Sequence, residues 1–171
     1  NGTCSFTADA GFAALLAARG IGRPNERESF HLAMGRVSRE LVDAVAGSGL
    51  PAPTIDDLVA MGIHGVTPDY VRSIAASGLR VRDAEDLVAF RIHGVDAGYV
   101  RAIAAAAPQF ANLSAEEVVS FKIHNVSPDV VRAYARLSGG PVGTDDAVAM
   151  AIHGVTPALI DELGRLGYAD V

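Results

Sequence analysis

A short string recurs along this chain at nearly constant spacing, and it constrains the fold more than any other feature. Ile-His-Gly-Val begins at Ile63, Ile92 and Ile152, and a variant, Ile-His-Asn-Val, begins at Ile123. The steps between successive copies are 92−63 = 29, 123−92 = 31 and 152−123 = 29 residues. A period of this size is typical of proteins that stack one supersecondary unit many times. The sequence therefore predicts an array of one short repeating unit.

The same frame continues toward the N-terminus in a weaker form. Val37, Ser38 and Leu41 fall in the slots that Val66, Thr67 and Tyr70 fill one unit later, and half a unit precedes them. Terminal repeats often diverge because they cap the array. We therefore predict a single helical-repeat domain over residues 1–171. Its units are approximately 1–22, 23–51, 52–80, 81–111, 112–141 and 142–171.

Each full unit opens with a pattern typical of a helix start. A candidate N-cap residue lies ten positions before the histidine slot, and an acidic residue follows three positions later. This is the spacing of a capping box, in which each side chain accepts a hydrogen bond from the backbone amide of the other residue. The pairs are Asn25 with Glu28, Thr54 with Asp57, Asp83 with Asp86, Ser114 with Glu117, and Gly143 with Asp146.

The first helix of a unit is expected to end at the histidine, because the next residue suits a left-handed backbone. That residue is Gly65, Gly94, Asn125 or Gly154, and Asn tolerates this conformation best after Gly. A second helix follows at once. Its candidate N-caps are Ser38, Thr67, Asp96, Ser127 and Thr156. Helices this short need neighbours to be stable, so the predicted fold is all-α: tandem two-helix repeats forming a solenoid or a compact helical array.

The two ends of the chain differ in how closely they follow the repeat. At the N-terminal end we expect four apolar residues to close the array: Phe6, Phe12, Leu15 and Leu16. The last unit keeps the full interior pattern, with Ile152, Val155, Leu159, Ile160 and Leu163. We therefore predict an apolar patch at the C-terminal end. A further segment, a partner or a second copy of the chain is expected to cover it.

Charge and composition exclude some classes of partner. The formal net charge is −6 and the sequence pI is about 5.2, whereas a nucleic acid or an anionic membrane surface attracts a basic protein. No apolar run approaches the roughly 18 residues that a membrane-spanning helix needs. We expect no nucleic-acid partner and no membrane insertion of this segment.

Four histidines lie at equivalent positions, namely His64, His93, His124 and His153. Such a ladder could bind metal or sense protons. Packed helices lie about 8–10 Å apart, however, and two nitrogens on one zinc ion, each about 2 Å from it, lie much closer together. We therefore expect the histidines to have a structural role at the helix end, and we expect no metal and no cofactor.

Three arginines form a second ladder, eight residues after the histidines: Arg72, Arg101 and Arg132. One interpretation is a solvated face whose arginines pair with Asp57, Asp86 and Glu117. The alternative is a stripe that binds an anion or a partner, so these arginines are candidate binding residues. The tyrosines at Tyr70, Tyr99 and Tyr134 are expected to belong to the core, given their helical register.

Catalytic patterns are missing from the sequence. We find no His-Glu-x-x-His, Gly-x-Ser-x-Gly or Ser-x-x-Lys. The single cysteine, Cys4, has no evident base near it in the sequence. We therefore predict no catalytic residues and no enzyme activity.

The phrases "LVAFRIHGVDAGYVRAIAA" and "IHGVTPDYVRSIAASGL" resemble short helical repeats of bacterial proteins similar to the BlaR/MecR type of membrane sensor. The resemblance covers roughly residues 54–171 and concerns the repeat alone, because the metallopeptidase and penicillin-binding motifs of those sensors are absent. It implies a bacterial source, an accessory or sensor module, and a location outside the cytoplasmic membrane, in the periplasm.

These observations favour a non-catalytic module for protein–protein interaction or scaffolding, as part of a bacterial sensor or regulatory protein. Its partner would be another protein or another segment of the parent chain, and a homo-oligomer could form through the C-terminal end. The alternative is a domain that senses a small ligand or a metal through a groove of the array.

Overall fold

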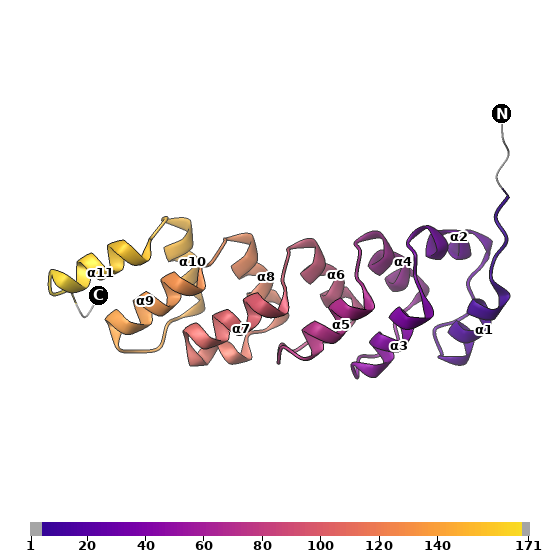
Figure 1. The fold of residues 1–171 in the computed structure, drawn as a ribbon, viewed down its shortest axis with the longest axis horizontal. Coiled ribbons are helices and arrows are strands. Elements are labelled where there is room, and N and C mark those ends of the chain that lie inside the picture. The colour runs from indigo at the N-terminus through magenta and orange to yellow at the C-terminus, as the bar shows by residue number, and fades with distance from the viewer. Residues whose placement is uncertain (1–4, 169–171) are drawn as a thin grey trace, which may run out of the picture. The chain divides into compact units, whose positions relative to one another are not determined.

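The computed structural model describes residues 5–168, and this part of the chain is all-helical, without a strand. The predicted all-α fold class is confirmed. The first helices of the hairpins are α2 (Glu26–Met34), α4 (Ile55–Ile63), α6 (Ala84–Ile92), α8 (Ala115–Ile123) and α10 (Thr144–Ile152). The second helices are α1 (Ala10–Ala18), α3 (Arg39–Gly47), α5 (Pro68–Ala75), α7 (Ala97–Ala106), α9 (Pro128–Ser138) and α11 (Pro157–Arg165), with one 3-10 helix, η1 (Pro108–Asn112) (Figure 1).

The helix boundaries follow the frame that the sequence predicts. Each first helix ends on the residue of the isoleucine slot, so the predicted breaks near Gly65, Gly94, Asn125 and Gly154 are confirmed. This recurrence supports the interpretation of the chain as a repeat. The solenoid itself stays a prediction.

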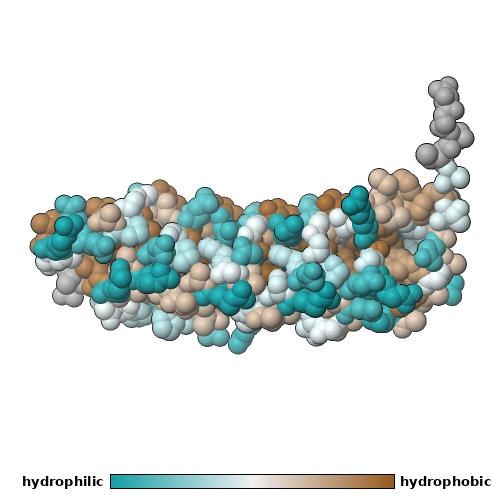
Figure 2. Space-filling model, viewed as in Figure 1, coloured by the Kyte–Doolittle hydropathy of each residue, from teal (hydrophilic) through white to brown (hydrophobic). Residues whose placement is uncertain are grey.

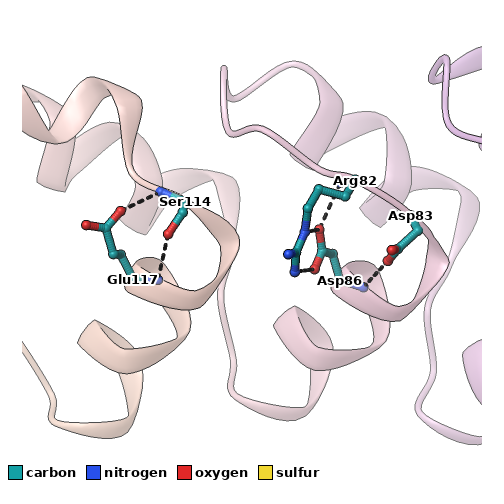
Figure 3. Close-up of polar contacts among 5 residues, drawn as sticks. All are labelled: Arg82, Asp83, Asp86, Ser114 and Glu117. Atoms are coloured by element: carbon teal, nitrogen blue, oxygen red, sulfur yellow. Dashed lines mark hydrogen bonds and ion pairs between the residues drawn. The ribbon is translucent and has the colours of Figure 1, made fainter.

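The first helices begin with the predicted caps. Complete capping boxes form at Asn25 with Glu28, Thr54 with Asp57, and Ser114 with Glu117. At Ser114, the hydroxyl accepts from the amide of Glu117 at 3.2 Å, and the Glu117 carboxylate accepts from the amide of Ser114 at 2.8 Å (Figure 3). Gly143 offers no side chain, so α10 begins without a side-chain cap.

The pair of Asp83 and Asp86 departs from this pattern. Asp83 accepts from the amide of Asp86 at 3.1 Å, as a cap should. The Asp86 carboxylate instead accepts three hydrogen bonds from Arg82, one from its amide (2.8 Å) and two from its guanidinium (3.1 and 2.8 Å) (Figure 3). Asp86 is 5% exposed, and a buried carboxylate needs such partners. Burial alone would raise the pKa of Asp86, but the hydrogen bonds and the charge of Arg82 hold this pKa below its ordinary value.

Helices α2, α4, α8 and α10 end in the same hydrogen-bonded turn, shown here for α4. The amide of Val66 donates to the carbonyl of Met61 at 2.9 Å, and the amide of Gly65 donates to that of Gly62 at 3.2 Å. These two bonds define a Schellman motif, which requires a left-handed residue after the cap. The residues in that slot have φ of +69° at Gly65, +68° at Gly94, +55° at Asn125 and +65° at Gly154. The prediction of a positive φ at these positions is confirmed.

The second helices also begin as the sequence predicts. The caps at Ser38, Thr67, Asp96, Ser127 and Thr156 each accept from an amide of the first helical turn. Pro128 and Pro157 occupy the first turn, where the missing amide has no intrahelical partner to lose.

Contacts between helices divide the described chain into two compact units. The first holds residues 5–73 and 81–92, and the second holds residues 74–80 and 93–168. Each is described by itself below, and the prediction of a single domain stays a prediction.

The first compact unit contains a layer of first helices, in which α2 packs on α4 and α4 packs on α6 (Figure 1). Their inner faces carry the core side chains Leu32, Leu58, Met61, Leu87 and Phe90, all at most 2% exposed. Helices α2 and α4 approach through two glycines. A Cβ atom added to Gly62 would lie 2.7 Å from the carbonyl oxygen of Gly35.

The second compact unit contains two such layers. Helix α8 contacts α10, whereas α7 contacts α9 and α9 contacts α11. Phe121 of α8 packs edge-on against Phe110, with ring centroids 5.2 Å apart, inside a cluster that includes Ile103 and Val131. Phe110 belongs to η1, where the unit with the 31-residue step holds its two extra residues. The insertion is therefore helical and contributes to the core.

The ends of the described chain match the predictions in part. At the N-terminal end Leu16 is fully buried, but Phe6 is 37% exposed and lies edge-on to Phe30 at 5.4 Å, so Phe6 does not close the array. At the C-terminal end Ile160 is buried, whereas Leu159 and Leu166 are exposed. An apolar patch is therefore present there, and what covers it stays a prediction.

Candidate interaction surface

The histidine ladder lies on exposed helix ends. His64, His124 and His153 are the C-cap residues of α4, α8 and α10, and all are exposed. Within residues 5–168, no group of three or more His, Cys, Asp and Glu side chains is placed to hold a metal ion. The cap position agrees with the structural role expected for these histidines. Cys4, the other candidate weighed from the sequence, lies outside the described residues.

The arginine ladder makes local ion pairs. Arg72 donates to Asp69 at 2.7 Å and Arg132 donates to Asp129 at 2.6 Å, each three residues earlier on the same helix. Arg72 and Arg132 therefore do not follow the interpretation in which the ladder pairs with Asp57, Asp86 and Glu117. Those carboxylates accept hydrogen bonds from the cap amides and from Arg82. Arg101 is exposed on α7 and has Gly98 in the slot of the aspartate. A binding role for Arg72, Arg101 and Arg132 stays a prediction.

The tyrosines join one hairpin to the next. The Tyr99 hydroxyl donates to the carbonyl of Val126 at 2.9 Å, and burial raises the pKa of this hydroxyl. The ammonium group of Lys122 lies 4.6 Å from the centre of the Tyr99 ring. In the first compact unit, Arg91 lies over the Tyr70 ring at 5.4 Å, and its Nε donates to the carbonyl of Gly65 at 3.1 Å. These cations are therefore held against their own neighbours.

The feature that the sequence interpretation missed is the exposure of the isoleucine slot. Ile152 was expected to follow the interior pattern, but Ile152 and the equivalent Ile63 are both exposed. The relative exposures are 68% for Met34, 69% for Ile63, 53% for Ile92, 53% for Ile123 and 61% for Ile152. We call Met34, Ile63 and Ile92 the isoleucine ridge of the first compact unit. Ile123 and Ile152 form the isoleucine ridge of the second.

Helix geometry explains why this slot faces outward. Leu58 and Met61 are three residues apart and both point into the core of the first compact unit. Ile63 follows Met61 by two residues, about 200° around the helix, and so it lies on the opposite side. Val59 and Ala60, one turn before Ile63, are half-buried beside it. Helix α4 thus has a second apolar face, and the other first helices repeat it.

The outer apolar face reaches the molecular surface in both units. Figure 2 shows hydrophobic patches, drawn in brown, between polar ones along the edge formed by the first helices of each unit. In α2 the face is widened by Phe30, which is 43% exposed and lies one turn before Met34. A sequence signal for this face exists: an apolar residue two positions after a core residue cannot share its side of a helix.

Acidic residues lie on the same outer face, two turns earlier. Asp56 and Glu85 precede Ile63 and Ile92 by seven residues, which returns nearly to the same side of a helix. Glu116 and Asp145 hold this slot in the second compact unit, and all four are exposed. In α2 the same slot holds an exposed arginine, Arg27. The isoleucine ridges are therefore bordered by carboxylates at the N-terminal ends of α4, α6, α8 and α10, and by an arginine at that of α2.

A cavity of about 370 Å³ lies elsewhere in the first compact unit, against its N-terminal segment. Apolar side chains of Phe6, Phe12, Leu32 and Val37 line it, together with the polar Arg39. Its volume falls in the range of small-molecule sites.

Comparison with models of known protein families and with curated proteins finds no match to this chain. Among residues 5–168, no helix is both long enough and apolar enough to cross a membrane. The geometry of the chain itself is therefore the basis of the functional argument.

Proposed function

We propose that this chain is a non-catalytic helical-repeat module that binds another protein through its isoleucine ridges. The observation that supports this is the large apolar side chain exposed at the same slot of each of the five hairpins. Single exposed apolar residues are ordinary on a protein surface. An aligned set of them, bordered by polar residues, is typical of an interaction surface.

Burial of such a ridge supplies part of the energy that recognition needs, and other contacts of the partner supply the rest. Fully burying an isoleucine side chain contributes about 1.5–3 kcal/mol. The ridge residues are 53–69% exposed, so roughly half of this contribution is left for a partner to supply. A partner that covers Met34, Ile63 and Ile92 would gain about 1 kcal/mol from each. Repeat proteins use extended surfaces of this kind for binding.

The likeness to repeats of BlaR/MecR-type sensors leads us to propose that the module belongs to a bacterial sensor or regulatory protein outside the cytoplasmic membrane. Its partner would then be a second protein or another segment of the parent chain. The support for this part is the repeat sequence alone, from "IHGVTPDYVRSIAASGL" onward.

A peptide selection tests the binding surface. Peptides displayed on phage are selected against the whole chain and then tested against a ridge variant with serine at Met34, Ile63, Ile92, Ile123 and Ile152. A control variant carries serine at Leu159, Leu166 and Tyr168, which are equally exposed but lie at the C-terminal end. We expect binding to be lost in the ridge variant and kept in the control. Binding that survives the ridge variant would contradict the proposal.

The cavity beside Phe6 and Phe12 favours a second candidate function, the sensing of a small ligand. A thermal-shift screen with small molecules and metals separates it from protein binding, because a specific ligand stabilises the folded state in a saturable way. A hit whose effect disappears in Phe12→Ser, but persists in the ridge variant, would favour this second function.

A further inference from the structure

We propose that the isoleucine ridges take one kind of occupant: a basic amphipathic helix with apolar side chains on one face and Lys or Arg beside them. This inference rests on the proposed function and goes further, since it names the chemistry of the partner. Three features of the ridge support it: the charge beside it, its width and the spacing of its residues.

The carboxylates beside the ridge favour a positively charged partner. In the first compact unit, Asp56 and Glu85 lie about 10.5 Å along their helices from Ile63 and Ile92, since seven residues of α-helix rise by that distance. A helix that covers the isoleucines is about 10–12 Å wide. Its flank therefore lies next to these carboxylates, where Lys or Arg side chains gain and acidic ones are repelled.

Two of the cations closest to the ridges contact their own neighbours, whereas Arg27 is exposed beside Phe30 at the α2 end of the first ridge. Arg91, next to Ile92, lies over Tyr70 and donates to the carbonyl of Gly65. Lys122, next to Ile123, lies over Tyr99. In α4 the position equivalent to Arg91 and Lys122 is Gly62, which has no charge. The charge that faces a bound segment is therefore acidic along α4 and α6, where Asp56 and Glu85 lie, in keeping with the net charge of −6.

The spacing of the ridge fits a helix. Helices α2, α4 and α6 pack side by side, and packed helices lie about 8–10 Å apart, so the ridge residues recur at about that interval. Every seventh residue of a helix recurs at about 10.5 Å, whereas alternate residues of a strand recur at about 6.7 Å.

The width of the ridge fits a helix as well. Met34 with Phe30, and Ile63 with Val59, make the band two residues wide on each first helix. An amphipathic helix presents an apolar stripe of similar width, whereas a strand or an extended chain presents a single row of side chains.

Two synthetic peptides test the charge of the occupant. Both have three heptads with Leu at the first and fourth positions, and the flanking positions are Lys in one peptide and Glu in the other. Binding of each to the whole chain is measured by fluorescence anisotropy. We expect the Lys peptide to bind at least roughly tenfold more tightly than the Glu peptide, and to weaken as salt rises. Equal binding, or tighter binding of the Glu peptide, would overturn the inference.

A matched pair of variants separates the acidic border from the overall charge. The border variant is Asp56→Asn with Glu85→Gln, both in the first compact unit. The control variant, Glu40→Gln with Glu162→Gln, removes the same charge from exposed positions on second helices. Loss of two exposed charge pairs predicts a loss of affinity of roughly fivefold in the border variant. The control is expected to change the affinity less than about threefold. Equal losses would overturn the inference.

The ridge variant distinguishes this inference from the proposed function. If serine at the five ridge residues abolishes binding of both peptides while the border variant changes nothing, the ridge binds a partner but not a basic one. If the ridge variant binds as tightly as the native chain, the proposed function itself is wrong.

Ridge-dependent binding of phosphatidylglycerol vesicles in preference to the Lys peptide would also overturn the inference. Should the border variant fail to fold by circular dichroism, the comparison of the Lys and Glu peptides in low and high salt decides.

Discussion

At the scale of single residues, the turn after each first helix depends on one left-handed position. Gly94 has φ +68°, and the equivalent residue in another hairpin is Asn125 at +55°. A Cβ atom at Gly94 would meet nothing closer than the Cε of Lys122, at 3.8 Å. The cost of a substitution there is therefore backbone strain and not a steric clash.

Gly94→Val is expected to reduce the free energy of unfolding by roughly 1–2 kcal/mol or more, because a β-branched residue resists the left-handed region. Gly94→Asn is expected to cost clearly less, since Asn hydrogen-bonds locally in this conformation. Chemical denaturation of both variants measures the difference. Equal losses would show that the left-handed turn does not govern this position.

Arg36 occupies the position equivalent to Gly94 in the most divergent full hairpin. Its φ is +54°, although it is neither glycine nor asparagine. Relief of this strain is worth about 1–2 kcal/mol, and the entropy of an added glycine costs about 0.5–1 kcal/mol. Arg36→Gly is therefore expected to raise the free energy of unfolding by up to about 1 kcal/mol. Arg36→Ala keeps the strain and serves as the control. A stabilisation that is equal in both variants would contradict this explanation.

At the scale of the helices, the start of α6 depends on the ion pair between the exposed Arg82 and the buried Asp86. Asp86 has a lowered pKa in the folded chain, because the hydrogen bonds and charge of Arg82 outweigh the effect of burial. A carboxyl of this kind stabilises the fold above its unfolded pKa, about 3.9. That contribution is lost as the pH falls through the lower, folded pKa.

Arg82→Ala is expected to reduce the free energy of unfolding by about 1–3 kcal/mol at pH 7, because it leaves a buried carboxylate without its partner. The difference from the native chain should shrink below about pH 4, as Asp86 becomes protonated. Denaturation at several pH values measures it. In the Asp86→Asn background the same arginine substitution should cost less than in the native chain. A pH-independent loss would mean that the charge of Asp86 is not the cause.

The contact between α2 and α4 depends on the absence of two side chains. Gly62→Ala places a Cβ atom 2.7 Å from the Gly35 carbonyl oxygen and 2.8 Å from the Gly35 Cα, so the backbone must move. We expect a loss of about 1–3 kcal/mol in thermal or chemical unfolding. Gly47→Ala is the control, because nothing lies within 4 Å of its added Cβ. That substitution should be neutral or stabilising, and a similar loss in both variants would refute the close approach.

At the scale of the whole molecule, the sequence predicts where the helices begin and end better than it predicts which of their faces are buried. Thr54 with Asp57, and Gly65, act within one helical turn, so their spacing alone indicates where a helix begins and ends. The 31-residue step alone does not show what its two extra residues form; they lie in η1, where the buried ring of Phe110 packs into the core.

The sequence interpretation of the surface was less accurate for two physical reasons. Arg72 could reach carboxylates of two helices, and the one on its own helix, Asp69, is the one it contacts. Ile63 belongs to a helix that is apolar on two faces, and hydrophobicity alone does not tell which face the neighbouring helices cover. Burial settles the question: Met61 is 0% exposed and Ile63 is 69% exposed.

The most direct test of the account is whether folding requires the ridge isoleucines. The measurement is the free energy of unfolding of Ile63→Ser/Ile92→Ser, compared with Met61→Ser/Phe90→Ser, whose residues lie two positions earlier and are fully buried. We predict that the ridge pair stays within about 0.5 kcal/mol of the native chain per substitution. The core pair should lose several kcal/mol. Comparable losses in the two variants would show that the isoleucines serve the core and not a partner.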